Sequence, residues 1–337
     1  MTFRRRIFLA SAIVITLLAT VVLSFSRPIA PAVREFEFTY RARIPQIPAN
    51  AKTVRLWIPL PRPDRYQSIS DLKIQSPVKF TERREPVYGN KYLYLEATPA
   101  QLRQPFELEI EFRAARREHR VSLTARPATT RKEDPATLAR WLEPDRLVPT
   151  SGLIAALAQQ ATQGATTPLE KARAIYEYVV STMRYDKSGT GWGRGDAIFA
   201  CTAKRGNCTD FHSLFIGMLR SVGIPARFEM GFPLPEDKLQ GDIPGYHCWA
   251  EFYVEPYGWI PVDASEAWKN PAKHDYFFGA HDVNRVLFTF GRDIRLVPPE
   301  QGDPLNYFIY PYVELDGKPY ASVETKFAFK DLETKLH

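Results

Sequence analysis

The sequence predicts an α+β protein in which an antiparallel β-rich region precedes a region of helices and a β-hairpin. Three observations support this fold class. Residues 33–126 contain several stretches that alternate apolar and polar side chains, which is typical of strands with one buried face. Residues 167–222 contain two stretches with apolar side chains at helical spacing. Residues 246–263 alternate again and reverse at a turn that contains Pro256 and Gly258, which predicts the hairpin.

Residues 1–32 have the pattern of an export signal. Three arginines, Arg4 to Arg6, precede an uncharged apolar run over residues 7–25, and small residues follow at Ala30 and Ala32. The run is close to the roughly 20 residues that span a bilayer, so a cleaved signal peptide, which we favour, and an uncleaved membrane anchor both stay open. In either case we expect the rest of the chain outside the cytoplasm, in the periplasm or another extracytoplasmic space.

Length and charge indicate two further domains and no nucleic-acid partner. The chain has 337 residues, and 45 Lys and Arg against 38 Asp and Glu give a net charge of +7. The densest basic run, residues 113–120, lacks the interleaved aromatic side chains of nucleic-acid surfaces, so we expect a solvated loop there. A charged linker near residue 131 divides an antiparallel β-sandwich (residues 33–130) from a second domain (residues 131–337).

The predicted helices of the second domain begin with clear capping signals. The first starts at a capping box, residues 167–170, with Pro168 at its first position. The second has an apolar face made of Phe211, Leu214, Phe215, Met218, Leu219 and Val222. Extending that face backwards by one turn reaches Cys208, and Asn207 is a suitable N-cap before it. Unpaired N–H groups and the helix macrodipole favour a negative charge at this end, which lowers the pKa of a thiol.

The hairpin carries a histidine and an aspartate that fit a cysteine nucleophile. His247 lies on its first strand and shares a face with Trp249, and Asp263 ends its second strand. A loop of three or five residues brings Asp263 to the face of His247, whereas a loop of four does not. With the five-residue loop, Asp263 stands opposite Trp249 and diagonal to His247, within reach of the imidazole. A thiol with a histidine and an orienting carboxylate is the arrangement of an activated nucleophile.

The cysteine count leaves the redox state open. The chain has three cysteines, Cys201, Cys208 and Cys248. A disulfide between Cys201 and Cys248 spares Cys208, one between Cys201 and Cys208 blocks it, and three free thiols are the third alternative. A metal site formed by Cys208, His212, His247 and Cys248 is disfavoured, because adjacent strand residues point apart and no standard metal-binding spacing is present. We therefore expect neither a metal nor a cofactor.

These residues resemble the transglutaminase-like superfamily of papain-related cysteine enzymes. The shared blocks are Gly206-Asn207-Cys208, Gly223-Ile224-Pro225-Ala226-Arg227, His247-Cys248-Trp249-Ala250-Glu251 and Trp259-Ile260-Pro261-Val262-Asp263. The resemblance covers about residues 167–263. It implies a papain/transglutaminase-like core, in which a nucleophile helix packs on an antiparallel sheet. It also implies that Cys208 is the nucleophile, that His247 is its base and acid, and that Asp263 orients His247.

The resemblance further implies acyl transfer on amide or peptide carbonyls through a thioester. For an exported bacterial member, hydrolysis of a peptide or protein substrate is favoured over protein cross-linking. The alternative is a non-catalytic binding or scaffold protein of the cell envelope that retains the fold. The backbone N–H of Cys208 is one expected oxyanion donor, and the motif assigns no second one.

Two other segments have a structural interpretation. Residues 188–195 hold four glycines but lack the Gly-Lys-Ser/Thr of a phosphate loop, so they predict a mobile loop or the rim of a substrate cleft with Trp192 on it. Beyond Asp263, residues 278–312 suggest strands that close the sheet beside the hairpin, followed by a turn at Asp316 and Gly317.

Overall fold

The computed structural model of the protein describes residues 32–332, apart from 103–104 and 125–131. The predicted export segment therefore lies, up to residue 31, outside the described residues. Among the helices of the described part, none combines the length and the hydropathy needed to cross a bilayer.

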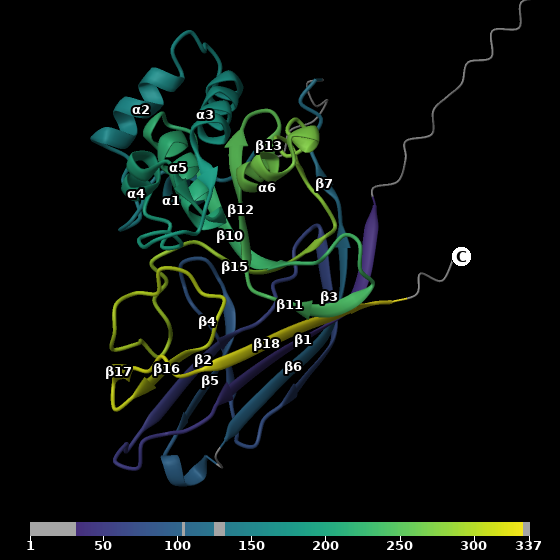
Figure 1. The fold of residues 1–337 in the computed structure, drawn as a ribbon, viewed down its shortest axis with the longest axis vertical. Coiled ribbons are helices and arrows are strands. Elements are labelled where there is room, and N and C mark those ends of the chain that lie inside the picture. Colours follow the sequence, from purple (N-terminus) through teal and green to yellow (C-terminus); the bar gives the residue numbers. More distant parts are fainter. Residues whose placement is uncertain (1–31, 103–104, 125–131, 333–337) are drawn as a thin grey trace, which may run out of the picture. The chain divides into compact units, whose positions relative to one another are not determined.

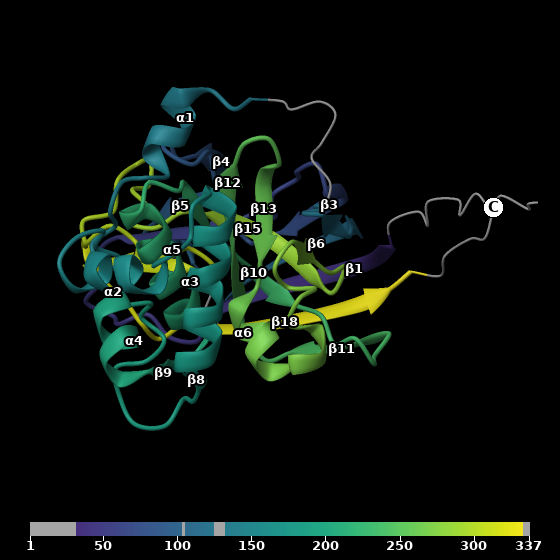
Figure 2. The same cartoon turned by 90° about the horizontal axis from the view of Figure 1, so that it is seen from above.

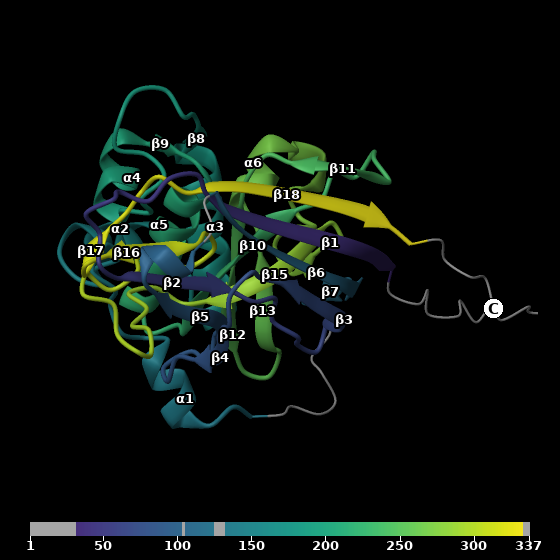
Figure 3. The ribbon, with the colours of Figure 1, turned by 90° about the horizontal axis from the view of Figure 1, so that it is seen from below.

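A five-stranded antiparallel sheet contains the longest strands of the molecule (Figure 3). Its order is β11 (Gln240–Ile243), β18 (Glu324–Asp331), β1 (Val33–Ile44), β6 (Phe106–Arg117) and β3 (Gln67–Gln75). On β1, Phe36, Phe38 and Tyr40 are fully buried, and the residues between them are more exposed. The buried face of β1, which was predicted from the alternation of apolar and polar residues, is therefore confirmed.

A second five-stranded sheet packs its apolar face into the same core. Its order is β17 (Lys318–Pro319), β16 (Tyr312–Leu315), β2 (Val54–Pro59), β5 (Lys91–Ala97) and β4 (Thr81–Arg84). Phe38 of the first sheet and Leu56 of the second belong to one buried apolar cluster. Two antiparallel sheets with a common core are the arrangement of a β-sandwich.

Strands from the C-terminal part of the chain complete both of these sheets. β18 lies between β1 and β11, and β16 pairs with β2 (Figure 1). Of the tail strands predicted beside the hairpin, only β15 (Arg285–Phe290) joins that sheet. The predicted turn at Asp316 and Gly317 is present, and both residues have positive φ. The alternation of apolar and polar residues shows which residues form strands. Which strands pair with one another depends on segments that lie elsewhere in the chain.

Helices gather beside a smaller antiparallel sheet, whose order is β13 (Gly258–Val262), β12 (His247–Val254), β10 (Ala226–Pro233) and β15 (Figure 2). The α-helices of the described residues are α1 (Pro135–Arg140), α2 (Leu153–Ala161), α3 (Pro168–Thr182), α4 (Ala197–Ala203), α5 (Cys208–Ser221) and α6 (Ala264–Lys269). The central helix is α5, which packs on β12 and β10 and contacts α2, α3, α4 and α6. Its residues from Cys208 to Arg220 are all buried. The predicted nucleophile helix on an antiparallel sheet is confirmed.

The described residues also form short elements that join distant segments. These are β7 (His119–Arg120) with β14 (Ala280–His281), β8 (Arg184–Tyr185) with β9 (Arg205–Gly206), and the 3₁₀ turns η1 (Pro99–Gln101) and η2 (Pro271–Lys273). The pair of β7 and β14 places a strand of the sandwich region against the segment that follows the hairpin.

The loop between β12 and β13 has an odd number of residues, as the predicted site requires. Val254 is paired with Gly258, and Ala250 is paired with Val262. If this register is continued, Asp263 stands opposite Trp249, as expected for a loop with an odd number of residues. Asp263 does not extend the strand, because its side chain accepts a hydrogen bond from the Glu266 N–H and caps α6.

The strand opposite His247 has room only for glycine. Gly231 on β10 is paired with His247, and a Cβ at this position would lie 1.9 Å from the backbone oxygen of Val286. The register between β10 and β15 also shifts between Met230 and Gly231. This close approach lets β15 pack against the strand that faces His247.

Candidate active site

Cys208 occupies the first position of α5, as predicted. The side chain of Asn207 caps the helix by accepting a hydrogen bond from the Thr209 N–H at 3.0 Å. The carboxylate of Asp210 accepts one from the Asn207 N–H at 2.9 Å, which completes a capping box. Amides of the first helical turn have no carbonyl partner one turn earlier, so the N-terminal end of α5 stabilises negative charge on Cys208.

His247 is held by Asp263 through one ring nitrogen. Its Nε2 lies 2.8 Å from Oδ2 of Asp263, and both side chains are buried. Arg285 donates to the same carboxylate oxygen at 3.1 Å, and Ser265 donates to Oδ1 at 3.1 Å. Burial by itself raises the pKa of Asp263, but the charges of His247 and Arg285 outweigh it and hold this pKa well below its usual value. Asp263 is therefore an ionised and fully bonded orienting group.

The thiol of Cys208 and the ring of His247 are close enough for each to shift the pKa of the other. Burial opposes charge on both groups, but each stabilises the charged form of the other. The pKa of Cys208 lies well below its usual value, because hydrogen bonds from Cys248 and His247 and the charge of His247 exceed the effect of burial. The pKa of His247 is raised to about 10, because Asp263 and Cys208 together exceed the effect of burial. The pair rests as thiolate and imidazolium at neutral pH.

A second cysteine, which the sequence did not single out as part of the site, lies near Cys208. Cys248 is close enough to help lower the pKa of Cys208, and its sulfur lies 3.6 Å from Nδ1 of His212. The tautomer of His212 follows from its backbone partners. Its Nδ1 lies 2.8 Å from the carbonyl oxygen of Cys208, which can only accept, so Nδ1 carries the proton. Its Nε2 accepts from the Ala264 N–H at 3.1 Å. Nδ1 of His212 carries a proton and Nε2 already accepts a hydrogen bond, so the S–H of Cys248 cannot donate to this ring. It is free to donate to Cys208.

This tautomer also bears on the metal site considered for these four residues. Both ring nitrogens of His212 are occupied by backbone groups, so the ring has no lone pair left for a metal ion. The four side chains do lie near one another, but as a hydrogen-bonded network around one thiolate.

Comparison with known proteins shows which family this part of the chain is similar to. The family model of the transglutaminase-like superfamily matches residues 155–264, which include Cys208, His247 and Asp263. Residues 155–264 form a transglutaminase-like core. The resemblance stated from the motif blocks is thereby confirmed. A solved structure of a candidate cysteine protease from Cytophaga hutchinsonii has the same fold, with a TM-score of 0.63 and 16% identity over 92% of this chain and 94% of that one.

Two bacterial relatives are similar in sequence. An uncharacterized protein of Haemophilus influenzae is 28% identical over 340 residues, which cover 90% of this chain and 91% of the relative. The uncharacterized protein YebA of Bacillus subtilis is 29% identical over 131 residues, which cover 35% of this chain and 18% of YebA. The first similarity extends over the β-sandwich as well as the transglutaminase-like core.

The side chains of Cys208 and His247 are covered. Cys208 has 2% and His247 has 5% of its surface exposed. Four tyrosines lie close enough for the charge of Cys208 to raise their pKa values, although burial is the larger cause for each: Tyr185, Tyr246, Tyr307 and Tyr310. Because so little of Cys208 is exposed, a substrate reaches the sulfur only when neighbouring side chains move.

The glycine-rich loop of residues 188–195 is fastened to the nucleophile helix at one end. The carboxylate of Asp210 accepts hydrogen bonds from the Gly193 N–H at 2.7 Å and from the Gly195 N–H at 3.0 Å. Trp192, which was predicted to lie on the rim of a cleft, is half-buried, and its Nε1 donates to the Gly189 carbonyl at 3.1 Å. Asp210 thus links the capping of α5 to the loop.

The three cysteines are free thiols, which is one of the alternatives left open by the sequence. Cys201 lies on α4, and its S–H donates to the Ile198 carbonyl at 3.2 Å. Burial raises the pKa of Cys201 and that of Cys248, so both are protonated at neutral pH. Only Cys208 has the environment of a thiolate.

Proposed function

We propose that the protein is a thiol-dependent acyltransferase that acts on amide or peptide carbonyls and passes the acyl group chiefly to water. The observation that carries this proposal is the contact of Cys208, at the start of α5, with His247, whose other nitrogen is bound to Asp263 at 2.8 Å. Cys208 is the nucleophile, His247 is the acid and then the base, and Asp263 holds the ring of His247 in place.

The first half of the reaction forms a thioester. The Cys208 thiolate attacks the carbonyl carbon, and the carbonyl oxygen takes the negative charge. The imidazolium of His247 then gives its proton to the amide nitrogen, the C–N bond breaks, and the amine leaves. Because Nε2 faces Asp263, the proton that moves is the one on Nδ1, which faces the thiol. Asp263 stays ionised throughout.

The second half returns the enzyme to its starting state. Neutral His247 takes a proton from water while the water oxygen attacks the thioester carbon. The C–S bond breaks, a carboxylic acid leaves, and thiolate and imidazolium are restored. An amine in place of water gives a cross-link, and the balance depends on how well the site excludes water.

Two groups are suited to stabilise the oxyanion. One is the backbone N–H of Cys208, in the first turn of α5. The other is the hydroxyl of Tyr246, whose oxygen accepts a hydrogen bond from Nδ2 of Asn207 at 2.9 Å. Its own proton is therefore available to another acceptor. Burial and the nearby charge of Cys208 raise the pKa of Tyr246, so the hydroxyl stays protonated.

The reaction is proposed to take place outside the cytoplasm, on a peptide or protein substrate. Support comes from residues 1–32, which carry the pattern of an export signal or membrane anchor. The three cysteines are buried, which protects them from external oxidants until the site opens.

Selective alkylation tests the proposal. Iodoacetamide at neutral pH is expected to label Cys208 far faster than the other two cysteines, with the sites read by peptide mass spectrometry. His247→Ala is expected to slow this labelling, whereas Cys201→Ala, a matched removal of a buried thiol, leaves it unchanged. Hydrolysis of a panel of peptide and amide substrates is expected from the unaltered protein and not from Cys208→Ala.

One observation favours the alternative of a non-catalytic envelope scaffold, namely that only 2% of the surface of Cys208 is exposed. If all three cysteines react slowly and equally, and if no substrate is turned over, the scaffold is the correct assignment and the acyltransferase is not.

A further inference from the structure

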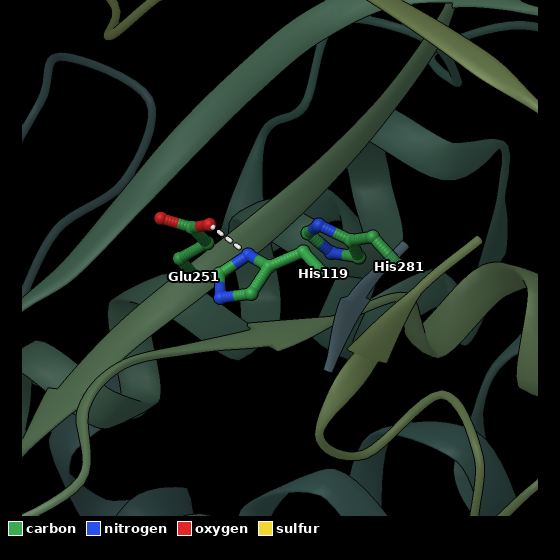
Figure 4. A group of neighbouring side chains, drawn as sticks. All are labelled: His119, Glu251 and His281. Carbon is green, nitrogen blue, oxygen red and sulfur yellow. Dashed lines mark ion pairs between the residues drawn. The ribbon is translucent and has the colours of Figure 1, made fainter. Parts of the chain in front are cut away.

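Two histidines and a glutamate meet in the interior, away from the candidate active site. They are His119 on β7, Glu251 on β12 and His281 on β14 (Figure 4). One ligand atom from each residue lies within 4.8 Å of the other two, and all three side chains are buried. Figure 4 shows the Glu251 carboxylate and the His281 ring on either side of His119. The residues lie far apart in the sequence, so no motif spacing signals the cluster.

Nitrogen atoms of both histidines lack aligned partners. Nδ1 of His119 lies 3.0 Å from Oε1 of Glu251, but the contact does not have the alignment of a hydrogen bond. Nδ1 of His281 also has no hydrogen-bond partner among the described residues. Since buried polar atoms are nearly always satisfied, two unsatisfied ring nitrogens in one cluster indicate that a ligand is missing between them.

The other contacts of these side chains orient them as metal ligands are oriented. Nε2 of His281 lies 3.2 Å from the carbonyl oxygen of Val262, which can only accept, so Nε2 carries the proton and the neutral ring presents a lone pair at Nδ1. The ring of His119 stacks on Tyr66, with 3.7 Å between the ring centroids. Arg227 binds Oε2 of Glu251 and leaves Oε1 to face His119. Contacts with neighbouring groups that orient each ligand side chain are characteristic of metal sites.

A route from solvent reaches the cluster. A surface cavity of about 720 Å³ is lined by His119 and Glu251, together with Tyr66 and Trp259. An ion can enter through this cavity, and a water molecule from it can occupy a fourth coordination position.

The charges around the cluster allow an additional cation. The nearby arginines have carboxylate partners: Arg227 with Glu251 and Glu229, Arg285 with Asp263 and Asp282, and Arg116 with Asp64.

We propose that His119, Glu251 and His281 bind one Zn²⁺ ion, with water as the fourth ligand. Two imidazoles and one carboxylate are a donor set that zinc accepts in tetrahedral geometry. Tetrahedral ligands at zinc distances are about 3.3 Å apart, so Nδ1 of His119 and Oε1 of Glu251, now 3.0 Å apart, are already near that separation, and the longer separations, of up to 4.8 Å, have to shorten by about 1.5 Å at most. As a ligand, His119 binds the ion through the lone pair of Nδ1 and carries its ring proton on Nε2.

The role of this ion is structural. It ties β7 of the sandwich region to β12 of the hairpin and to β14 beyond it. Glu251 follows His247 by four residues on one strand, and the ring of Trp249 lies 5.8 Å from that of His247 and 5.9 Å from that of His281, so the ion would not contact the ring of His247. Zinc binding does not depend on the proposed acyl transfer, so either proposal can fail alone.

The test is a zinc titration of the full chain carrying Cys208→Ala, which removes the thiolate as a competing ligand. After treatment with a chelator, calorimetry is expected to show one Zn²⁺ per chain with micromolar or tighter affinity, and the melting temperature is expected to rise with zinc concentration. Adding His281→Ala is expected to weaken binding by more than roughly 100-fold, because losing a ligand exceeds the 10–100-fold effect of losing an outer partner. Adding His274→Ala, at a partly exposed histidine, leaves binding unchanged.

A second measurement does not need the His281 variant to fold. X-ray absorption of the zinc-loaded Cys208→Ala protein is expected to show only nitrogen and oxygen ligands, at about 2.0–2.1 Å and including two imidazoles. Sulfur in the first shell, no binding of zinc, or equal zinc affinity in a folded His281→Ala variant would each overturn the proposal.

Discussion

Cys248→Ala removes the S–H group that helps to lower the pKa of Cys208, and we expect it to raise that pKa. A hydrogen bond to a charged group contributes about 1.5–3 kcal/mol. One pKa unit corresponds to about 1.36 kcal/mol, so the loss amounts to about 1–2 units. A thiol is a weak donor, which favours the lower end of that range. His247 still faces the sulfur in the variant, so the pKa does not return to that of a free thiol.

The assay is the rate of Cys208 alkylation by iodoacetamide as a function of pH. Because only the thiolate reacts, the rate rises as pH increases through the pKa of Cys208 and then reaches a plateau. In the unaltered protein the midpoint is expected well below about 8.5, the value of a free cysteine. Cys248→Ala moves the midpoint to higher pH and leaves the plateau unchanged. Cys248→Ser, which keeps a donor, moves it less. An unchanged midpoint in the alanine variant would refute the role assigned to Cys248.

Three other substitutions test separate parts of the structure. Asp263→Asn is expected to lower kcat by up to roughly 10⁴-fold, as at the orienting carboxylate of a serine triad, and full turnover of an amide substrate would contradict this. Tyr246→Phe is expected to lower kcat by roughly 10²-fold while the alkylation rate of Cys208 stays the same, because alkylation forms no oxyanion; parallel losses in both assays would count against an oxyanion role. Gly231→Ala is expected to cost about 1–3 kcal/mol of unfolding free energy in denaturant titration, because its Cβ would meet the Val286 backbone; an unaltered midpoint would show that β15 can move away.

The parts of the structure that depend on local patterns were predictable from the sequence. Capping residues and apolar spacing identified Cys208 at the start of α5, and counting the residues of the turn identified the hairpin register that brings Asp263 to the face of His247. Each of these patterns extends over a few residues, so each can be interpreted without knowing the rest of the fold.

The contacts that depend on chain segments far apart could not be predicted. Cys248 was expected to point away from His247, and nothing local showed that Cys208 contacts both residues. Arg285, which donates a hydrogen bond to Asp263, could have been singled out in the sequence. It is a single charged residue at the start of a buried apolar strand. The cluster of His119, Glu251 and His281 had no such signal. Its members meet only after the sandwich region and the hairpin have packed together.

The pairing of β18 with β1 sets a condition on how the chain is made. Phe36 on β1 is a partner of Asp331 on β18, almost 300 residues later, so β1 has one open edge until β18 has been synthesised. Contacts of such long range are slow to form, and an unpaired edge is prone to join other chains. A chain that stops before β18 would therefore lose the sandwich as well as its last strand, and the sandwich region is not a module that can be expressed without the residues that follow it.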